Sequence, residues 1–324
     1  MMKLNCAILD DYQHVAEQMA DWSVIESQVN IDSYHEYFED RNELIEAIQD
    51  YEILVIMRER TKFPEDVLRK LPNLKLLITT GMRNASIDLK AAGKLGITVC
   101  GTRGKGAAPT ELTWALILGL SRHLIQENES FRNNGAWQST IGIGLQGKTL
   151  GLLGLGKIGQ QMATIGQAMG MNILAWSENL TAERAEAAHV QLAASKEELL
   201  AESDFLSIHL VLSDRTRRII GKSELALMKP SAYLINTSRA GIVDQTAMIE
   251  ALQDGTIAGA GLDVFDTEPL PSDHILRKLP NVLATPHIGY VSDDNYKCFY
   301  KDAVDNIVGY LNNDIQRELI YVRT

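Results

Sequence analysis

Several features are absent from this sequence of 324 residues, and each absence argues against a class of protein. No apolar run reaches the roughly 18–20 residues that a membrane-spanning helix needs. The amino-terminal stretch carries the acidic pair Asp10 and Asp11 where an export signal needs a longer apolar core, so we expect a cytoplasmic protein. The three cysteines, Cys6, Cys100 and Cys298, form no CxxC pair. A disulfide framework or a bound metal is therefore not expected.

Positive charge is also scarce. The chain has 31 lysine and arginine residues against 42 aspartate and glutamate residues, and this net charge of −11 argues against nucleic acid as the main partner. Hydrophobic residues make up 45% and charged residues 23%, which is ordinary for a soluble globular protein. The chain is longer than one typical domain and long enough for two.

Short apolar segments alternate with helical patterns in the first hundred residues. We expect strands over residues 4–10, 52–58, 74–80 and 96–102, and helices over 41–50 and 86–96. The predicted strands are almost wholly apolar, which is typical of parallel strands that are covered on both faces. The alternation of strand and helix predicts an α/β fold built in layers.

A second alternating series follows a long helix that we predict over residues 109–133. Its strands are expected over residues 148–154, 172–177, 205–210, 232–238, 259–265 and 281–286. Six strands with helices between them are enough for a complete doubly wound parallel sheet. One more helix is predicted over residues 293–313.

The sequence GLGKIG, residues 154–159, follows the first strand of the second series and opens a predicted helix. In this context the three glycines match the fingerprint of dinucleotide binding. Gly154 permits a tight turn, Gly156 lets the backbone approach a pyrophosphate, and Gly159 lets the helix pack close to the strand. Lys157 and Ile158 begin the helix, whose free N–H groups attract phosphates. The segment therefore predicts a nucleotide-binding domain.

The fingerprint also expects an acidic residue about 20 positions later, where it holds the ribose diol of NAD. Ser177 stands at that place and Glu178 comes one residue late. A serine does not repel the 2′-phosphate of NADP, but no cation follows before Arg184, and Glu178 can turn toward the ribose. We therefore expect NAD to be the preferred cofactor, with NADP possible.

Three polar segments end predicted strands of the second series. They are INTSRAGIVD (235–244), GLDVFDTEPL (261–270) and ATPHIGY (284–290). Because ligands bind outside the carboxyl ends of the strands in open α/β sheets, Arg239, Glu268 and His287 are expected to lie in one crevice.

With these segments in their order and spacing, the sequence resembles the D-isomer-specific 2-hydroxyacid dehydrogenases, which include phosphoglycerate dehydrogenase and glyoxylate/hydroxypyruvate reductase. The resemblance covers most of the chain. It implies two doubly wound parallel-sheet domains: an inserted Rossmann NAD-binding domain (103–290), and a flavodoxin-like substrate domain (1–102 and 291–324). It also implies a homodimer formed through the nucleotide domains, by the apolar helix near Trp114–Leu124 and the arm near Trp137. A surface helix as apolar as this one is unusual in a monomer.

The residue types fit the chemistry of hydride transfer to or from C2 of a 2-oxo or 2-hydroxy acid. His287 can exchange a proton with the substrate oxygen because the pKa of histidine lies near working pH. By resemblance, Glu268 orients the imidazole and favours its charged form. Arg239 can bind the substrate carboxylate through two hydrogen bonds. These three residues are the predicted catalytic set.

The resemblance also assigns binding residues. Asp263 matches the position that faces the nicotinamide carboxamide. The other residues expected at the cofactor are His209, Thr237, Ser238 and Gly289. By resemblance, a glycine-containing loop presents backbone N–H groups to the substrate carboxylate, and Gly81 and Met82 belong to the matching stretch. Arg83 in this stretch is a cation that the family does not place there, so it is either a substrate contact or a solvated loop arginine. Arg58 and Arg60 raise the same question, and we favour Arg60 as the substrate contact. Tyr290 stands where a smaller residue is expected.

Other functions of the same fold remain open. The formate dehydrogenase type carries glutamine where this chain has Glu268, which disfavours it, whereas phosphite oxidation passes that test. A corepressor-like NAD-binding regulatory protein is a further alternative, although we expect no appended interaction segment of the kind that such a role favours.

Overall fold

The computed structural model describes residues 3–320, which form two compact units. The first unit comprises the residues up to Lys105 together with those from Val291 onward, and the second comprises Gly106–Tyr290. The chain first passes from the first unit to the second after Lys105, which lies beyond the expected boundary at residue 102. The reason is that the Lys105 N–H donates to Oδ1 of Asn295 at 2.7 Å and so belongs to the first unit. Within residues 3–320, the structure contains no helix with the length and apolar character of a membrane span.

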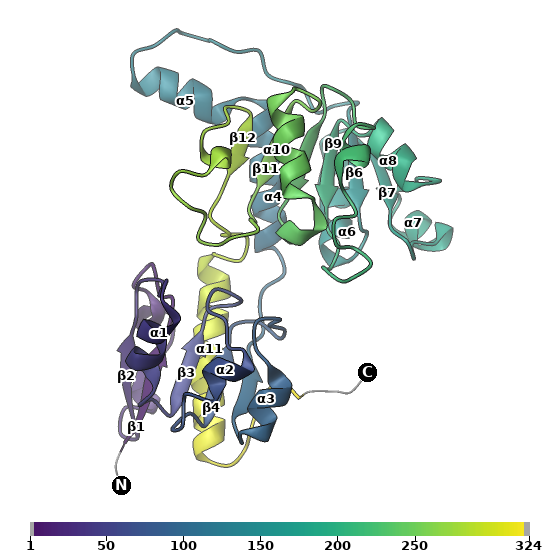
Figure 1. The fold of residues 1–324 in the computed structure, drawn as a ribbon. Helices are drawn as coiled ribbons and strands as arrows, with labels where there is room; N and C mark the ends of the chain where they lie inside the picture. The colour runs from purple at the N-terminus through teal and green to yellow at the C-terminus, as the bar shows by residue number, and fades with distance from the viewer. Residues whose placement is uncertain (1–2, 321–324) are drawn as a thin grey trace. The chain divides into compact units, whose positions relative to one another are not determined.

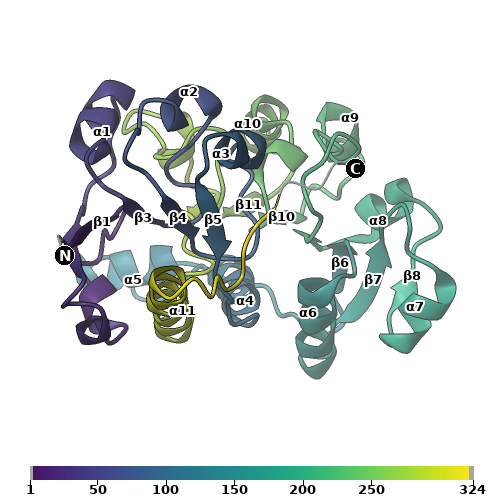
Figure 2. The ribbon, with the colours of Figure 1, turned by 90° about the horizontal axis from the view of Figure 1, so that it is seen from below.

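The first unit contains a five-stranded parallel sheet in the order β2-β1-β3-β4-β5. Its strands are β1 (Leu4–Ile8), β2 (Val29–Ser33), β3 (Ile53–Ile56), β4 (Leu76–Thr79) and β5 (Thr98–Gly101). Its helices are α1 (Arg41–Ile48), α2 (Glu65–Leu68), α3 (Leu89–Lys94) and α11 (Asp293–Leu311), with short 3-10 turns at Ala16–Gln18 and Trp22–Val24. Figure 2 shows α1, α2 and α3 over one face of the sheet and α11 under the other. This strand order is that of flavodoxin-like folds, as predicted.

The edge strand β2 is one of the elements that the sequence-based prediction missed. Its residues VNIDS alternate between apolar and polar, and only Val29 is buried. A strand with one neighbour and an exposed face needs no continuous apolar run, so it carries a weaker signal than β3 or β4, whose residues are all buried.

The last helix, α11, is tied to the segment that leaves β5. Asp302 on α11 accepts hydrogen bonds from the Arg103 backbone N–H (2.7 Å) and from the Arg103 guanidinium (3.0 and 2.7 Å). The two residues are separated by 199 positions in the sequence. The Asp302 side chain is almost wholly buried, so these bonds hold a carboxylate that would be costly to bury alone.

The second unit contains a seven-stranded parallel sheet in the order β12-β11-β10-β9-β6-β7-β8. Its strands are β6 (Thr149–Leu153), β7 (Asn172–Trp176), β8 (Gln191–Leu192), β9 (Phe205–Ile208), β10 (Tyr233–Asn236), β11 (Gly259–Leu262) and β12 (Val282–Ala284). Its helices are α4 (Ala108–Ser121), α5 (Leu124–Arg132), α6 (Lys157–Ala168), α7 (Ala182–Ala187), α8 (Lys196–Glu202), α9 (Lys222–Leu225) and α10 (Gln245–Gln253), with 3-10 turns at Ala240–Ile242 and Ile275–Arg277. Figure 2 shows α4 and α6 on one face of this sheet and α8, α9 and α10 on the other. The order contains the Rossmann arrangement, and the chain reverses direction across the sheet between β6 and β9.

Six strands were expected in this sheet and the structure has seven. The additional strand, β8, is two residues long and lies at the edge beside β7. Its sequence is too short to produce a periodic pattern.

The prediction of a single helix over residues 109–133 is wrong, because α4 ends at Ser121 and α5 begins at Leu124. His123 between them adopts a left-handed backbone conformation (φ 49°). The carbonyl of Ser121 accepts the N–H of Ile143, a residue of the returning chain, at 2.6 Å. This bond replaces the next helical hydrogen bond, so a contact distant in sequence terminates the helix.

Part of the apolar surface near Trp114 is covered within the second unit itself. Trp114, Ile117 and Leu120 are buried within the second unit, where α4 packs against its sheet and α6. Five exposed large apolar side chains lie on α5 and the segment after it, which we term the arm (residues 124–142). Figure 1 shows α5 extending away from the sheet of this unit.

Candidate functional site

The turn between β6 and α6 has the geometry that the glycine fingerprint requires. Gly154 has φ 109°, and a Cβ there would lie 2.7 Å from the carbonyl oxygen of His209. A Cβ on Gly159 would collide with the carbonyl oxygen of Gly154. A Cβ on Gly156 would meet no atom within 4 Å. Two of the glycines therefore permit tight packing, and Gly156 leaves an open side beside the helix terminus.

That open side fits the pyrophosphate of a dinucleotide. Gly156 is the N-cap of α6 and Lys157 is its first residue, and both are exposed, while Ile158 is half-buried. The first N–H groups of a helix lack intrahelical acceptors and carry a partial positive charge, which suits an anion. The residues of this turn therefore fit a bound nicotinamide dinucleotide.

The loop after β7 carries the residues expected at the ribose. Ser177 is half-buried and Glu178 is exposed. The Ser177 carbonyl accepts the N–H of Leu180 at 2.9 Å, which closes the turn. Arg184, on α7, turns back toward this loop, where its guanidinium donates to the carbonyl of Asn179 at 3.4 Å. A cation is thus closer to the loop than its place in a helix suggested.

His209 follows β9, next to the glycine turn. Its Nε2 lies 2.8 Å from the hydroxyl of Ser207. Burial lowers the pKa of His209 from its ordinary value of 6.5 to about 4. The imidazole is therefore neutral at physiological pH and adds no charge to the cofactor side of the sheet.

The loop after β10 is fixed by the buried side chain of Asn236. Its amide accepts the N–H of Ser238 and donates to the carbonyl of Arg239, both at 3.1 Å. The Ser238 hydroxyl donates to the carbonyl of Ile208 at 2.7 Å, which ties the loop to β9. Thr237 contacts the Thr113 hydroxyl of α4 at 2.7 Å. The loop thus holds Thr237 and Ser238, both predicted at the cofactor, and the half-buried Arg239 beyond them.

Glu268 and His287, which are 19 residues apart in the sequence, are in direct contact. Oε2 of Glu268 lies 2.6 Å from Nδ1 of His287. The other carboxylate oxygen of Glu268 accepts the N–H of Phe265 at 2.9 Å, which fixes its orientation. The ring of Tyr290 lies edge-on to the imidazole, with the ring centres 5.7 Å apart. Arg239, Glu268 and His287 follow the adjacent strands β10, β11 and β12 at one edge of the sheet.

Asp263 directly follows β11 and is fully buried. Its Oδ1 accepts the Thr285 hydroxyl (2.7 Å) and the Ile288 N–H (2.8 Å), and its Oδ2 accepts the Gly289 N–H (2.8 Å). Burial raises the pKa of the Asp263 carboxyl, and these hydrogen bonds oppose that effect. The carboxylate and Gly289, both predicted at the cofactor, are thus bonded to each other.

The residues expected at the substrate lie in the first unit, after β3 and β4. The Arg60 guanidinium donates to the carbonyl of Asp10 at 2.9 Å and stacks over the Tyr12 ring at 4.4 Å. Gly81 has φ 94°, and its N–H donates to the Thr102 hydroxyl at 2.8 Å. The next two residues, Met82 and Arg83, are exposed.

The buried side chain of Asn84 holds this loop. Its amide nitrogen donates to the hydroxyl of Thr79 at 2.8 Å and to the carbonyl of Arg58 at 2.5 Å. The sequence analysis missed Asn84 and, in the second unit, Asn236. The available signal in the sequence was an asparagine at the end of a strand or in the turn after it, because asparagine side chains often hydrogen-bond to neighbouring backbone groups.

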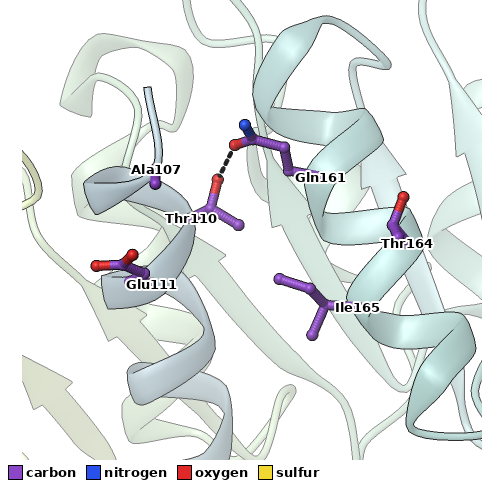
Figure 3. Close-up of a pocket in the computed structure, with 6 residues that line it drawn as sticks. All are labelled: Ala107, Thr110, Glu111, Gln161, Thr164 and Ile165. Atoms are coloured by element: carbon purple, nitrogen blue, oxygen red, sulfur yellow. Dashed lines mark hydrogen bonds between the residues drawn. The ribbon is translucent and has the colours of Figure 1, made fainter. Parts of the chain in front are cut away.

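A hollow on the surface of the second unit lies between α4 and α6 (Figure 3). It is lined by Ala107, Thr110, Glu111, Gln161, Thr164 and Ile165, and the Thr110 hydroxyl bonds to Gln161 at 2.6 Å. Its one charged group is a carboxylate, which does not suit the phosphates of a nucleotide. Residues 3–320 contain no group of three or more side chains of the metal-binding types placed to hold an ion.

The second unit also matches a known family. The model described as D-isomer specific 2-hydroxyacid dehydrogenase, NAD binding domain, matches residues 114–289. The glyoxylate reductase of Aeropyrum pernix is 39% identical over 272 residues, which cover 80% of this chain and 81% of that protein. The D-3-phosphoglycerate dehydrogenase of Methanocaldococcus jannaschii is 37% identical over 86% of this chain. This chain spans about half of that relative, 53% of its length.

A solved structure gives the same result for the fold. The phosphoglycerate oxidoreductase of Vibrio cholerae O395 superposes with a TM-score of 0.91 at 39% sequence identity. The match covers 96% of this chain and 99% of that one.

Proposed function

Because this chain belongs to the D-isomer-specific 2-hydroxyacid dehydrogenase family, we propose that it transfers a hydride between a nicotinamide cofactor and a D-2-hydroxy acid or its 2-oxo acid. The observation that carries the proposal is the contact of 2.6 Å between Glu268 and His287, at the sheet edge that also holds the glycine turn. The cofactor, when bound, supplies or accepts the hydride.

The chain's own residues supply the proton transfer. Because Nδ1 of His287 is engaged by Glu268, Nε2 is the nitrogen that exchanges a proton with the substrate oxygen. The Glu268 carboxylate orients the ring, and it is itself held by the Phe265 N–H. Arg239 binds the substrate carboxylate, because a guanidinium remains charged and donates two parallel hydrogen bonds.

The substrate loop of the first unit supports a role in binding acids. Met82 and Arg83 are exposed on a loop whose base is fixed by Asn84 and by the Gly81 N–H. We assign Gly81, Met82 and Arg83 to the substrate carboxylate region, together with Arg60. The cation of Arg83 favours acids that carry a second negative group, so a substrate panel should include such acids beside glyoxylate and hydroxypyruvate.

The choice of nicotinamide cofactor rests on the loop after β7. Glu178 is exposed there and repels a 2′-phosphate, whereas Arg184 reaches the same loop from α7 and attracts one. We expect NAD to be preferred, with weak discrimination, because a carboxylate adjacent to Ser177 outweighs a cation that is directed at a backbone carbonyl. The test compares kcat/KM with NADH and NADPH on one accepted acid. A preference of tenfold or more for NADPH contradicts this expectation, and Arg184→Ala then shows whether Arg184 is responsible.

The catalytic proposal is tested with His287→Asn. Turnover of 2-oxo acids should fall by about 10²–10⁴-fold, the usual contribution of a general acid/base, while NADH binding measured by fluorescence persists. The parent protein is screened first against 2-oxo acids with both reduced cofactors, and against formate and phosphite with both oxidised cofactors. Near-normal turnover of His287→Asn, or activity on formate or phosphite alone, would reject the proposal.

We also propose a homodimer formed through the arm. Five large apolar side chains of the arm are exposed, from Ile125 at 51% to Ile141 at 94%. The arm is nevertheless ordered by its own contacts, since Glu127 accepts the hydroxyls of Ser139 (2.9 Å) and Thr140 (2.6 Å). An ordered segment that exposes this much apolar surface fits a second copy of the chain.

A further inference from the structure

The Asp263 carboxylate is directed at the loop that carries His287. It accepts three hydrogen bonds of 2.7–2.8 Å, and all three donors belong to residues 285–289. Two of these donors are the backbone N–H groups of Ile288 and Gly289, which directly follow the histidine. A fully buried carboxylate that accepts backbone N–H groups holds them strongly, because the bonds are charge-assisted and shielded from water.

The backbone of His287 needs such support. Its φ of 53° lies in the left-handed region, which residues with a side chain adopt rarely. Such conformations persist where the surrounding bonds determine them. On the amino-terminal side, the His287 N–H donates to the carbonyl of Thr285 at 2.9 Å. On the carboxyl-terminal side, Asp263 holds the next two N–H groups, so both flanks of the histidine are fixed.

Gly289 shows how closely the carboxylate seats against this loop. A Cβ on Gly289 would lie 2.9 Å from Oδ2 of Asp263, closer than a Cβ carbon normally lies to a neighbouring heavy atom. The contact therefore requires glycine at position 289, in the same segment as the histidine.

We propose that Asp263 is a positioning residue that fixes the backbone of His287 and thereby the direction in which its Nε2 points. This proposal rests on the proposed role of His287 as the acid/base. It differs from the role that the family resemblance implies for Asp263, a contact with the nicotinamide carboxamide. Asp263→Asn separates the two roles, because an amide keeps one acceptor oxygen and presents N–H groups where the second oxygen accepted a backbone N–H.

The first measurement is hydrogen–deuterium exchange of the peptide that contains residues 285–290, in the protein without cofactor. In Asp263→Asn, the backbone amide hydrogens of Ile288 and Gly289 should exchange with deuterium faster than they do in the parent protein. The matched control is Asp204→Asn, which also weakens a carboxylate that accepts a backbone N–H (Thr149, 2.8 Å) in the second unit but lies at the opposite ends of the strands. Unchanged exchange in Asp263→Asn overturns the proposal. Because this readout needs no substrate, it remains informative if the proposed function fails.

The second measurement compares kcat with the affinities for NADH and for ADP-ribose, which lacks the nicotinamide. Asp263→Asn should lower kcat by on the order of 10²-fold, the effect of misplacing a catalytic group, and leave both affinities within about twofold. A tenfold loss of NADH affinity with unchanged ADP-ribose affinity would assign Asp263 to the carboxamide instead. If the parent protein itself shows no turnover of any 2-oxo acid, the proposed function is rejected, whereas the positioning role is still tested by hydrogen–deuterium exchange. If Asp263→Asn does not fold, Thr285→Val removes one donor and should produce smaller changes in the same direction.

Discussion

At the scale of single residues, burial of the His209 imidazole makes stability depend on pH. The unfolded chain binds a proton near the ordinary pKa of 6.5, whereas the folded protein binds it only near pH 4. Between these values the unfolded state holds more protons, so stability is fully present above about pH 6.5 and is lost as the pH falls toward 4. The thermal midpoint should therefore fall less over this range in His209→Gln than in the parent protein.

The control for this prediction is His189→Asn. His189 is exposed, and asparagine tolerates its left-handed backbone (φ 54°). Its thermal midpoint should follow the parent curve. Parallel curves for His209→Gln and the parent would show that burial of His209 has no energetic consequence.

Residue types and spacing predicted the pairing of Glu268 with His287 but not the direction of the Asp263 carboxylate. Both partners lie in loops that follow adjacent parallel strands, so the topology brings these loops to one edge of the sheet. The orientation of Asp263 depends on where the N–H groups of Ile288 and Gly289 point. That in turn depends on the left-handed backbone at His287, which no local sequence pattern specifies.

At the scale of elements, the turn into α6 yields a prediction that separates stability from cofactor binding. Gly156→Ala adds a methyl group on the open side, so the thermal midpoint should change by no more than about 2 °C while NADH affinity falls about tenfold or more. Gly159→Ala places a methyl group against the Gly154 carbonyl and should lower both quantities. Calorimetry and fluorescence titration measure them. Unchanged NADH affinity in Gly156→Ala would contradict the assignment of the open side to the pyrophosphate.

The elements that the sequence predicted well are those whose own residues determine them. Strands such as β3, β9 and β10 are mostly apolar and buried at every position, and the sequence located each of them to within a few residues. The end of α4 depends instead on the N–H of Ile143, which lies more than twenty residues away. The edge strands β2 and β8 depend mainly on a neighbouring strand. Contacts of this kind leave no periodic pattern of apolar residues in the local sequence.

At the scale of the whole molecule, the arm predicts the oligomeric state. Light scattering at micromolar concentration should report a dimer for the parent protein, because exposed apolar side chains such as Trp137 and Ile141 are stabilised by burial in an interface. The double variant Trp137→Ser, Ile141→Ser should be a monomer. Val24→Ser removes an exposed apolar side chain outside the arm and should remain dimeric. A monomeric parent protein would refute the arm as an interface.

The helix α11, which Asp302 ties to Arg103 after β5, has a consequence for synthesis on the ribosome because it comes late in the chain. All five strands of the first unit emerge early, yet the helix that covers one face of their sheet is made after the whole second unit. The second unit is continuous in the chain and can fold as soon as its own residues have emerged. At about 5–20 residues per second, the first sheet therefore waits ten seconds or more with an uncovered apolar face, and during this interval a nascent chain is most exposed to proteases and chaperones. The part of the protein that is translated first is thus completed last.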